Sequence, residues 1–334
     1  MSQYRKILLI ADPTLPTTPA FQRAVALATA TGAELHLCVF DYSSAIAAVA
    51  VVSEKVSELA KWGFVEQRER WLREQAVVLS ATGLHVETQM IWGTPVHECI
   101  IENVAALAPD LVLKDIHHEP LLKRVLFTPL DWQLLRLCPA PLLMVSAAAH
   151  SLPQRVIAAV DTARQDQAAE DLNDVIVHAA LQLAIQCDAT LHLAQAFDEV
   201  IPAMPAELGA TEGFIEACAQ LRESNHKSFD AFATRHSVPA EQRHFLSGQA
   251  VSVLTGLARK SRTDVLVMGS TTRTGLVRIV MGSTAERILG DLRCDVLVVK
   301  PAGFMADLAR HFDFGKSGHR AHAQWSAPIE LEQP

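Results

Sequence analysis

The sequence lacks the cysteine patterns and long hydrophobic runs that mark disulfide-rich, zinc-binding or membrane-spanning proteins. Its six cysteines stand singly, with no C-x-x-C pair and no Cys/His cluster at zinc spacing, so we expect reduced and mostly buried thiols. The longest run of small apolar residues, Ala45–Val52, is far shorter than the roughly 20 residues that cross a bilayer. A signal-peptide run is also missing, because Asp12 and Pro13 end the apolar run that begins at Lys6. We therefore expect a cytoplasmic protein with no membrane contact.

Positive charge is also scarce, since 29 Lys and Arg stand against 37 Asp and Glu, a formal net charge of −8. Nucleic acid and acidic membranes both require a basic surface, so we expect neither as a partner. Catalytic motifs are missing as well. There is no G-x-x-x-x-G-K-[ST] phosphate loop, no G-x-S-x-G elbow, and no Ser/His/Asp or paired-carboxylate set at a defined spacing. We predict that the protein is not an enzyme.

What the sequence does contain is an internal repeat, in which four segments return in the same order. Lys6–Asp12 returns as Arg155–Asp161, Ala33–Leu37 as Ala189–Leu193, Trp92–Val96 as Ser247–Val251, and Asp110–Leu113 as Asp264–Val267. A chain of 334 residues also exceeds the usual size of one core. We therefore predict two domains, 1–149 and 150–303, joined through the linker 147–154, and a weakly structured tail at 304–334.

Each copy alternates strands and helices. In the first copy we predict strands near 6–11, 34–40, 85–91, 110–115 and 141–146, and helices near 18–31, 53–81, 96–107 and 129–137. The strands are continuous apolar runs, as burial on both faces of a parallel sheet requires. The predicted fold class is therefore α/β, with two tandem doubly wound parallel five-stranded sheets of Rossmann-like type. A long charged helix is also expected at Gly213–Arg235.

The last strand of each copy, Pro141–Ser146 and Val296–Lys300, is an apolar edge that would otherwise stay unpaired. Proteins usually cover such edges. We expect the two copies to pair with each other as an internal pseudo-dimer, and we leave further homodimerisation open. The apolar run Ala45–Val52 either lines a ligand pocket or packs against the neighbouring domain, and we favour packing.

The stretch GSTTRTGLVRIVMGSTAER, which opens at Gly269, indicates a ligand site in the second copy. Asp161, Gly269 and Gly282 all follow strand ends, where open parallel sheets bind ligands. Asp161 can accept from an adenine amino group or a ribose hydroxyl, and the glycine-rich loop can bind phosphates through its N–H groups. The alternatives are structural. A strand-end aspartate often only caps a turn, and Ser283–Glu286 is a capping box that would begin any helix.

With these residues the chain resembles the universal stress protein family, and specifically its tandem E-type members, over residues 4 to about 302. ATP-binding members carry the pattern G-x-x-G-x(9)-G-[ST] after the fourth strand and an aspartate at the end of the first. The pattern falls here on Gly269, Thr272, Gly282 and Ser283, with Asp161 as the aspartate. Thr272 stands where the second glycine is expected, and its β-branched side chain disfavours a left-handed backbone.

The resemblance implies one site for ATP with Mg, in the second copy only. Met268 and Gly269 would flank the ribose and triphosphate, while Gly282, Ser283 and Thr284 would hold phosphate through main-chain N–H and hydroxyl groups. The first copy differs at three of these positions, with Asp115 for Gly269, Phe127 for Gly282 and Pro129 for Thr284. None of the three suits a triphosphate, because Asp115 brings a carboxylate, Phe127 fills the space and Pro129 has no N–H to donate.

The function implied by the resemblance is that of a non-catalytic regulator in stress response. One alternative is a nucleotide-free scaffold or a small apolar-ligand-binding protein. A second alternative is a slow ATP hydrolase or nucleotidyl-transfer enzyme, and the protein partners stay unknown. His117 and His118 are adjacent and point apart, and His311, His319 and His322 are unclustered, so we predict no metal site.

Overall fold

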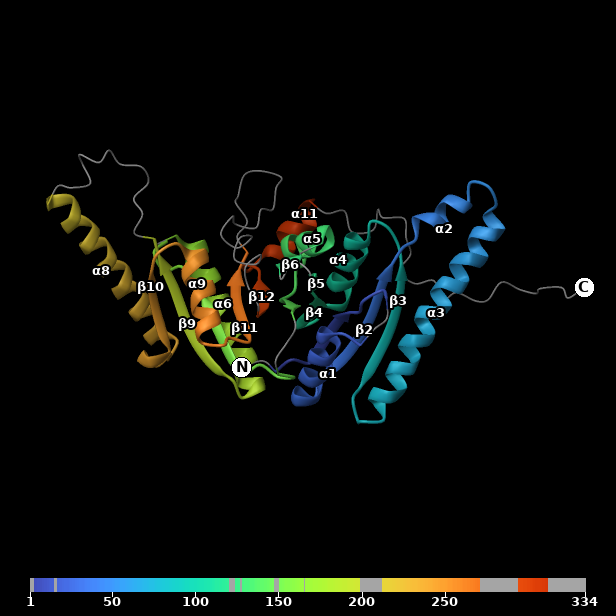
Figure 1. The fold of residues 1–334 in the computed structure, drawn as a ribbon, viewed down its shortest axis with the longest axis horizontal. Coiled ribbons are helices and arrows are strands. Elements are labelled where there is room, and N and C mark those ends of the chain that lie inside the picture. The colour runs from blue at the N-terminus through green and yellow to red at the C-terminus, as the bar shows by residue number, and fades with distance from the viewer. Residues whose placement is uncertain are drawn as a thin grey trace, which may run out of the picture.

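The computed structural model describes residues 3–14, 17–119, 124–126, 128–146, 150–164, 166–198, 212–270 and 294–311. Its centre is one ten-stranded sheet with the order β10-β9-β8-β11-β12-β7-β4-β1-β2-β3 (Figure 1). The strands are β1 (Lys6–Ile10), β2 (Glu34–Asp41), β3 (Val86–Trp92), β4 (Leu111–Asp115), β7 (Leu142–Val145), β8 (Arg155–Ala159), β9 (Thr190–Phe197), β10 (Arg243–Ser247), β11 (Val265–Gly269) and β12 (Asp295–Val299). A separate small hairpin pairs β5 (His117–Glu119) with β6 (Arg124–Leu126).

Each half contributes five parallel strands, and the two halves have the same strand order. The α/β class and the doubly wound parallel sheets are therefore confirmed. The two predicted sheets are joined edge to edge, because β12 and β7 pair antiparallel with Leu297 opposite Leu143. We call this junction the seam. The two edges that the sequence left without a partner thus satisfy each other's backbone groups.

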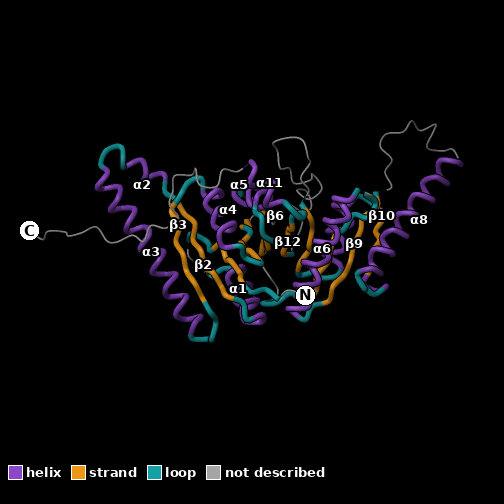
Figure 2. The backbone as a smooth tube through the Cα atoms, turned by 180° about the vertical axis from the view of Figure 1, so that it is seen from behind, coloured by secondary structure: helices purple, strands orange, loops and turns teal. Residues whose placement is uncertain are grey.

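Helices cover both faces of the sheet. On one face lie α1 (Pro19–Thr31), α3 (Glu54–Ser80), α6 (Gln167–Cys187) and α8 (Glu212–Arg235). On the other lie α4 (Val96–Leu107), α5 (Pro129–Leu137) and α9 (Ala250–Lys260). The remaining elements are α2 (Ser44–Val49), α11 (Phe304–His311) and a 3₁₀ turn at Ala240–Gln242. Seen from behind, the long helices α3 and α8 lie at the two ends of the molecule (Figure 2).

Local sequence explains where α1 begins and ends. The first turn of this helix contacts the end of β4 in the first half. Thr18 caps the helix by accepting from the Phe21 N–H, and Pro19 occupies the first helical position, where its missing N–H costs nothing. Gly32 ends the helix with φ of 69°, a left-handed conformation that suits glycine. Alanine and leucine then line the buried face, so the helix packs closely on the sheet.

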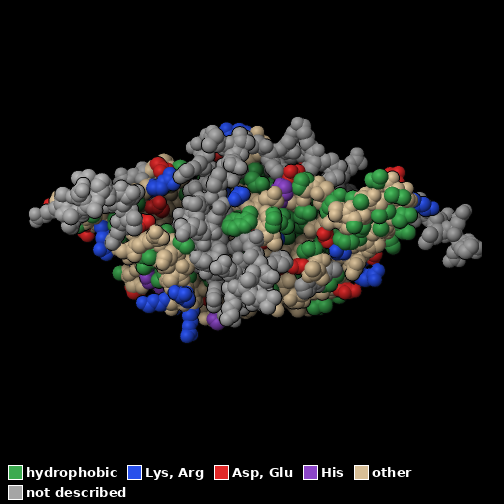
Figure 3. All heavy atoms as spheres, turned by 45° about the horizontal axis from the view of Figure 1, so that its top comes forward, with side chains coloured by type: hydrophobic (Ala, Val, Ile, Leu, Met, Phe, Trp, Pro, Cys, Tyr) green, Lys and Arg blue, Asp and Glu red, His purple; other side chains and the backbone are tan. Residues whose placement is uncertain are grey.

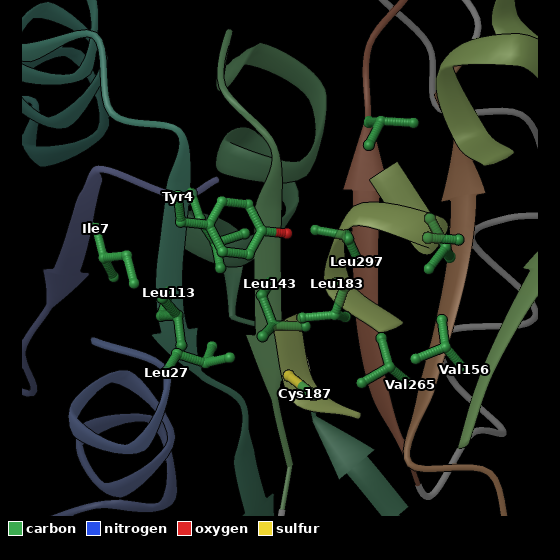
Figure 4. Close-up of a cluster of buried hydrophobic side chains, with 14 of the residues drawn as sticks. Tyr4, Ile7, Leu27, Leu113, Leu143, Val156, Leu183, Cys187, Val265 and Leu297 are labelled. Atoms are coloured by element: carbon green, nitrogen blue, oxygen red, sulfur yellow. The ribbon is translucent and has the colours of Figure 1, made fainter. Parts of the chain in front are cut away.

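The apolar core is continuous across the seam. Leu143 and Leu297 are fully buried in one cluster that also holds Leu183 of α6, and Figure 4 shows these three side chains gathered at the junction. The second half reaches further over the first, because Phe304 and Leu308 of α11 are buried against Ile101 of α4. The part of the tail that the structure describes is therefore packed on the first half.

A buried ion pair also crosses the seam. Arg23 of α1 and Asp295 of β12 are each 1% exposed, and their Nη2 and Oδ2 atoms lie 3.0 Å apart. Asp295 also accepts from the Ser146 N–H, and Arg23 donates to the Ser151 carbonyl. Burial raises the pKa of Asp295 to about 6, against the opposing effect of the Arg23 charge. The two halves are thus held in register by polar as well as apolar contacts.

Our expectation that Ala45–Val52 packs against the neighbouring domain is wrong. The segment begins as α2, in which no residue is buried, and Val51 and Val52 are each 90% exposed. It lies beside α3 at the end of the sheet farthest from the seam (Figure 1). The helix forms because Ser43 caps it and Ser57 of α3 donates to the Ile46 carbonyl. No helix that the structure describes is long and apolar enough to cross a membrane.

Candidate functional site

The candidate site lies at the carboxyl edge of the second half, where β8 and β11 are neighbours. Asp161 follows β8, and Met268 and Gly269 end β11, so the structure brings these three residues to one edge. Our other predicted site residues lie outside the residues that the structure describes: Thr272, Gly282, Ser283 and Thr284.

Asp161 makes a turn at the end of β8. Its Oδ1 accepts from the Ala163 N–H at 3.2 Å, which is the turn-capping role that we weighed as the alternative. The Asn173 amide of α6 holds the same main chain from the other side, accepting from Asp161 N and donating to Asp161 O. Asp12 makes the matching turn in the first half, where it accepts from the Thr14 N–H at 2.7 Å. The Asp161 side chain itself is exposed.

Met268 and Gly269 both have packing roles. The Met268 side chain is buried in the apolar cluster on the α9 face. A Cβ at Gly269 would lie 2.8 Å from Leu172 of α6, closer than real Cβ atoms approach a carbon. Any side chain at 269 would therefore force the Leu172 side chain to move, whether or not a ligand binds.

Two buried polar groups at this edge escaped the sequence analysis. Gln195 of β9 is fully buried, and its Oε1 accepts from both the N–H and the hydroxyl of Thr162, beside Asp161. Within the described part of the chain, Gln195 Nε2 and Ser270 Oγ are buried without a hydrogen-bond partner. Such groups are rare in proteins, because each one loses its hydrogen bonds to water. The available signal was a glutamine within the otherwise apolar run LAQAF.

The first half differs at the corresponding edge, because Asp115 ends β4 where Gly269 ends β11. Asp115 accepts from the Ala20 N–H at 2.8 Å and from the Thr18 hydroxyl, so its carboxylate occupies the amino end of α1. Burial raises the pKa of Asp115, while these hydrogen bonds lower it. A phosphate here would meet a carboxylate that already holds the helix donors.

The start of α5 in the first half is also occupied by protein groups. Lys114 Nζ lies 2.7 Å from Asp131 Oδ1, and both side chains are buried. Asp131 completes the predicted capping box with Thr128, whose N–H donates to Asp131 Oδ2. Phe127, the residue before the cap, lies outside the described residues. The N–H groups of Thr128 and Asp131 at this helix end are therefore paired within the protein.

The family model described as the universal stress protein family matches residues 3–146 and 154–300. The chain belongs to the universal stress protein family. It is a tandem protein, since each half matches the model once. Universal stress protein E of Salmonella typhi is 32% identical over 304 residues, which cover 90% of this chain and 96% of that protein. Universal stress protein E of Escherichia coli K12 is 30% identical, with coverage of 90% and 95%.

Solved structures agree with this assignment. A universal stress protein from Pseudomonas aeruginosa UCBPP-PA14 aligns with a TM-score of 0.69 and 29% identity, covering 92% of this chain and 97% of that one. A universal stress protein from Archaeoglobus fulgidus aligns with a TM-score of 0.59 at 15% identity, which shows the fold alone. Membership of this family places the tandem protein in stress response.

Proposed function

We propose that this tandem universal stress protein is a non-catalytic regulator that binds ATP, with Mg, in its second half only. The observation that carries the proposal is the difference between Asp115 and Gly269 at corresponding strand ends. In the first half a carboxylate holds the donors of α1, whereas β11 offers no charge at this position. The end of β11 is therefore free of the carboxylate that would repel phosphate at the end of β4.

The neighbouring polar groups support the same site. Gln195 Nε2 is a donor and Ser270 Oγ a donor and acceptor, and neither has a partner within the described chain. Ribose and phosphate oxygens would satisfy both groups. The exposed carboxylate of Asp161 lies at the same edge and can accept from a ribose hydroxyl or an adenine amino group.

A nucleotide-free scaffold is the second candidate function. Leu172 accounts for Gly269 through packing, and the turn at Ala163 accounts for Asp161 through capping. Thr272 also departs from the family's glycine pattern. In this alternative both edges have lost their ligand, and the surfaces of the protein recruit partners.

Calorimetric titration of ATP with magnesium into the full chain separates the two candidates. We expect one site per chain in the wild type and none in Gly282→Phe, which copies Phe127 of the first half. Asp161→Asn should weaken binding about 10- to 150-fold, because one charge-assisted hydrogen bond contributes about 1.5–3 kcal/mol. Asp12→Asn is the matched control, since Asp12 makes the same turn in the first half, and it should bind ATP as the wild type does.

Absence of binding to the wild type at millimolar ATP would refute the nucleotide site and favour the scaffold. Binding that persists in Gly282→Phe would place the phosphates elsewhere. The non-catalytic assignment has its own assay, the release of phosphate from ATP over hours. Sustained turnover in the wild type that Asp161→Asn removes would contradict it.

A further inference from the structure

A second polar cluster lies in the first half, at the opposite edge of the sheet. Glu34 begins β2, His36 lies two residues further along that strand, and Glu87 is the register partner of His36 on β3. Side chains two residues apart on one strand point to the same face, as do register partners on neighbouring parallel strands. Three chemically active side chains from two strands therefore share one face of the sheet.

Both carboxylates lie beside the His36 ring, each next to a different ring nitrogen. His36 Nε2 lies 3.1 Å from Glu34 Oε1, and His36 Nδ1 lies 3.6 Å from Glu87 Oε2. One ligand atom from each of the three residues lies within 4.8 Å of the other two. His85 is close by, with its Nδ1 3.5 Å from the same Glu34 oxygen. Its side chain is 73% exposed, so it can turn toward the cluster.

The His36 ring is the least accessible member of the cluster, with a side chain that is 9% exposed. Its Nε2 faces Glu34 without the geometry of a hydrogen bond, and it has no other partner in the described chain. A neutral imidazole keeps one nitrogen lone pair available to a metal ion.

We propose that Glu34, His36 and Glu87 form a site for a divalent transition metal such as zinc. One imidazole with two carboxylates suits zinc and its neighbours, whereas calcium and magnesium prefer ligand sets made of oxygen alone. Ligand atoms of a tetrahedral zinc site lie about 3.3 Å apart. One ring nitrogen of His36 would bind the ion together with one oxygen of each carboxylate, and these three atoms, which lie within 4.8 Å of one another, would draw closer around the ion. His85 or water completes the coordination.

The remaining charge near the cluster is Lys6, the register partner of Glu34 on β1. Its Nζ donates to the Leu107 carbonyl at 3.1 Å, so the ammonium is held beside the cluster and does not occupy it. Lys6 offsets one of the two carboxylate charges. A divalent cation would then leave the site with a net positive charge, and we expect binding of moderate rather than extreme affinity.

The place of the cluster indicates what the metal would do. Among the strands that the structure describes, β3 is at the end of the ten-stranded sheet and pairs only with β2. A metal bound by Glu34 and His36 on β2 and by Glu87 on β3 would link these two strands. Because the unfolded chain has no preformed site, metal binding would stabilise the fold and would hold β3 in register with β2.

The second half provides a natural control at the same place in its own sheet. Thr190 begins β9 as Glu34 begins β2, and His192 follows it as His36 follows Glu34. His192 Nδ1 lies 3.0 Å from His244 Nε2 of β10, so the two imidazoles partner each other. No carboxylate stands among these three residues, and we expect one zinc site per chain rather than two.

Zinc titrated into the metal-stripped full chain tests the proposal. We expect one saturable site, a rise in Tm that chelation reverses, and at least tenfold weaker binding in Glu87→Gln. Glu87 is well exposed, so this isosteric change should leave the apo protein folded with an unchanged Tm. His192→Gln removes the equivalent histidine of the second half, and His236→Gln removes a histidine that lies 2.8 Å from Asp174. Both controls should bind zinc as the wild type does.

The position of the ion provides a check that needs no variant. Crystals of the wild type grown with zinc should show an anomalous scattering peak among Glu34, His36 and Glu87. Equal zinc affinity and stoichiometry in the wild type and in Glu34→Gln/Glu87→Gln would overturn the proposal. So would a peak elsewhere with none at this cluster, because the three residues would then form only an ion-paired group.

Discussion

The two halves of the chain have the same strand order, yet their final strands differ at the seam. β12 of the second half begins with Asp295 and is followed by Lys300. The aligned positions around β7 are Pro141 and Ser146, neither of which carries a charge. Asp295 and Lys300 both reach into the first half, where they contact Arg23 and the Leu135 carbonyl. The contacts of Asp295 and Lys300 at the seam therefore have no counterpart at the aligned positions of the first half.

A duplicated chain can use such one-sided contacts, whereas a dimer of identical subunits would repeat each contact about its two-fold axis. The helices show the same asymmetry. Arg23 lies eight residues before the end of α1, and Ala179 lies eight residues before the end of α6. Duplication has allowed one half to carry the arginine and the other its carboxylate. The halves have thereby become specific partners for each other.

The largest expected effect comes from removing the charge that the first half contributes. Arg23→Met leaves Asp295 buried without its ion pair, and breaking a buried pair costs about 3–5 kcal/mol. Urea denaturation of the full chain measures this loss. Arg164→Met is the control, since Arg164 and Asp166 form an exposed pair at 2.9 Å, and such pairs contribute about 0–1 kcal/mol.

A double variant separates the pair from simple packing. Arg23→Met with Asp295→Leu removes both charges, and it should recover most of the stability that Arg23→Met loses, because apolar replacements of buried pairs are often neutral. A cost below about 1 kcal/mol for Arg23→Met alone would show that the asymmetric pair contributes little to the seam.

The strands were predictable from the sequence because buried parallel strands are continuous apolar runs. The run at 110–115 became β4 (Leu111–Asp115), and the charged helical segment at 53–81 became α3 (Glu54–Ser80). The repeat gave the two-fold organisation, since matched segments fold alike. Capping residues such as Thr18 and Gly32 then set helix ends through local bonds, which sequence reasoning can follow.

Contacts between distant segments were not predictable in the same way. The Leu172 side chain lies close to Gly269 only because α6 packs on β11, and the spacing of the two residues along the chain gives no sign of this contact. Glu87 meets His36 because of the register between β3 and β2, and spacing along the chain gives no sign of it. Ala45–Val52 has a composition typical of a buried segment, yet it stays on the surface. Composition alone does not determine whether an apolar segment is buried or against which part of the protein it packs.

Lys300, the second charged group of the seam, should have an intermediate effect on the free energy of unfolding, and this effect should depend on pH. Lys300 Nζ is buried and donates to the Leu135 carbonyl, and burial lowers the pKa of Lys300 to about 7 from an ordinary 10.5. Above pH 7 the unfolded chain thus holds a proton that the folded chain has lost, so stability rises with pH by up to about 1.4 kcal/mol per unit. Lys300→Met should remove this slope.

Denaturation at pH 7, 7.5, 8 and 8.5 compares the two proteins. The window stays below pH 9 because burial raises the pKa of the Cys138 thiol to about 11, which changes stability in the opposite direction at higher pH. The Ser146→Ala variant is the control from the aligned position of the first half, and it should keep the wild-type slope. Equal slopes in wild type and Lys300→Met would show that Lys300 stays charged in the folded protein.

The smallest expected effect concerns the outer end of the first half, far from the seam. Figure 3 shows hydrophobic side chains gathered at the right end of the molecule, over α2 and α3, and Val51 and Val52 are among the most exposed apolar residues described. Since they bury little surface, Val51→Ser/Val52→Ser should change the free energy of unfolding by less than about 0.5 kcal/mol. Leu72→Ala in the buried stripe of α3 should cost about 2–5 kcal/mol in the same denaturation assay. A loss above about 1 kcal/mol in the double serine variant would mean that this apolar run is covered in solution. If that loss depended on protein concentration, the covering surface would belong to a second copy of the chain. If it did not, the run would be covered by another part of the same chain.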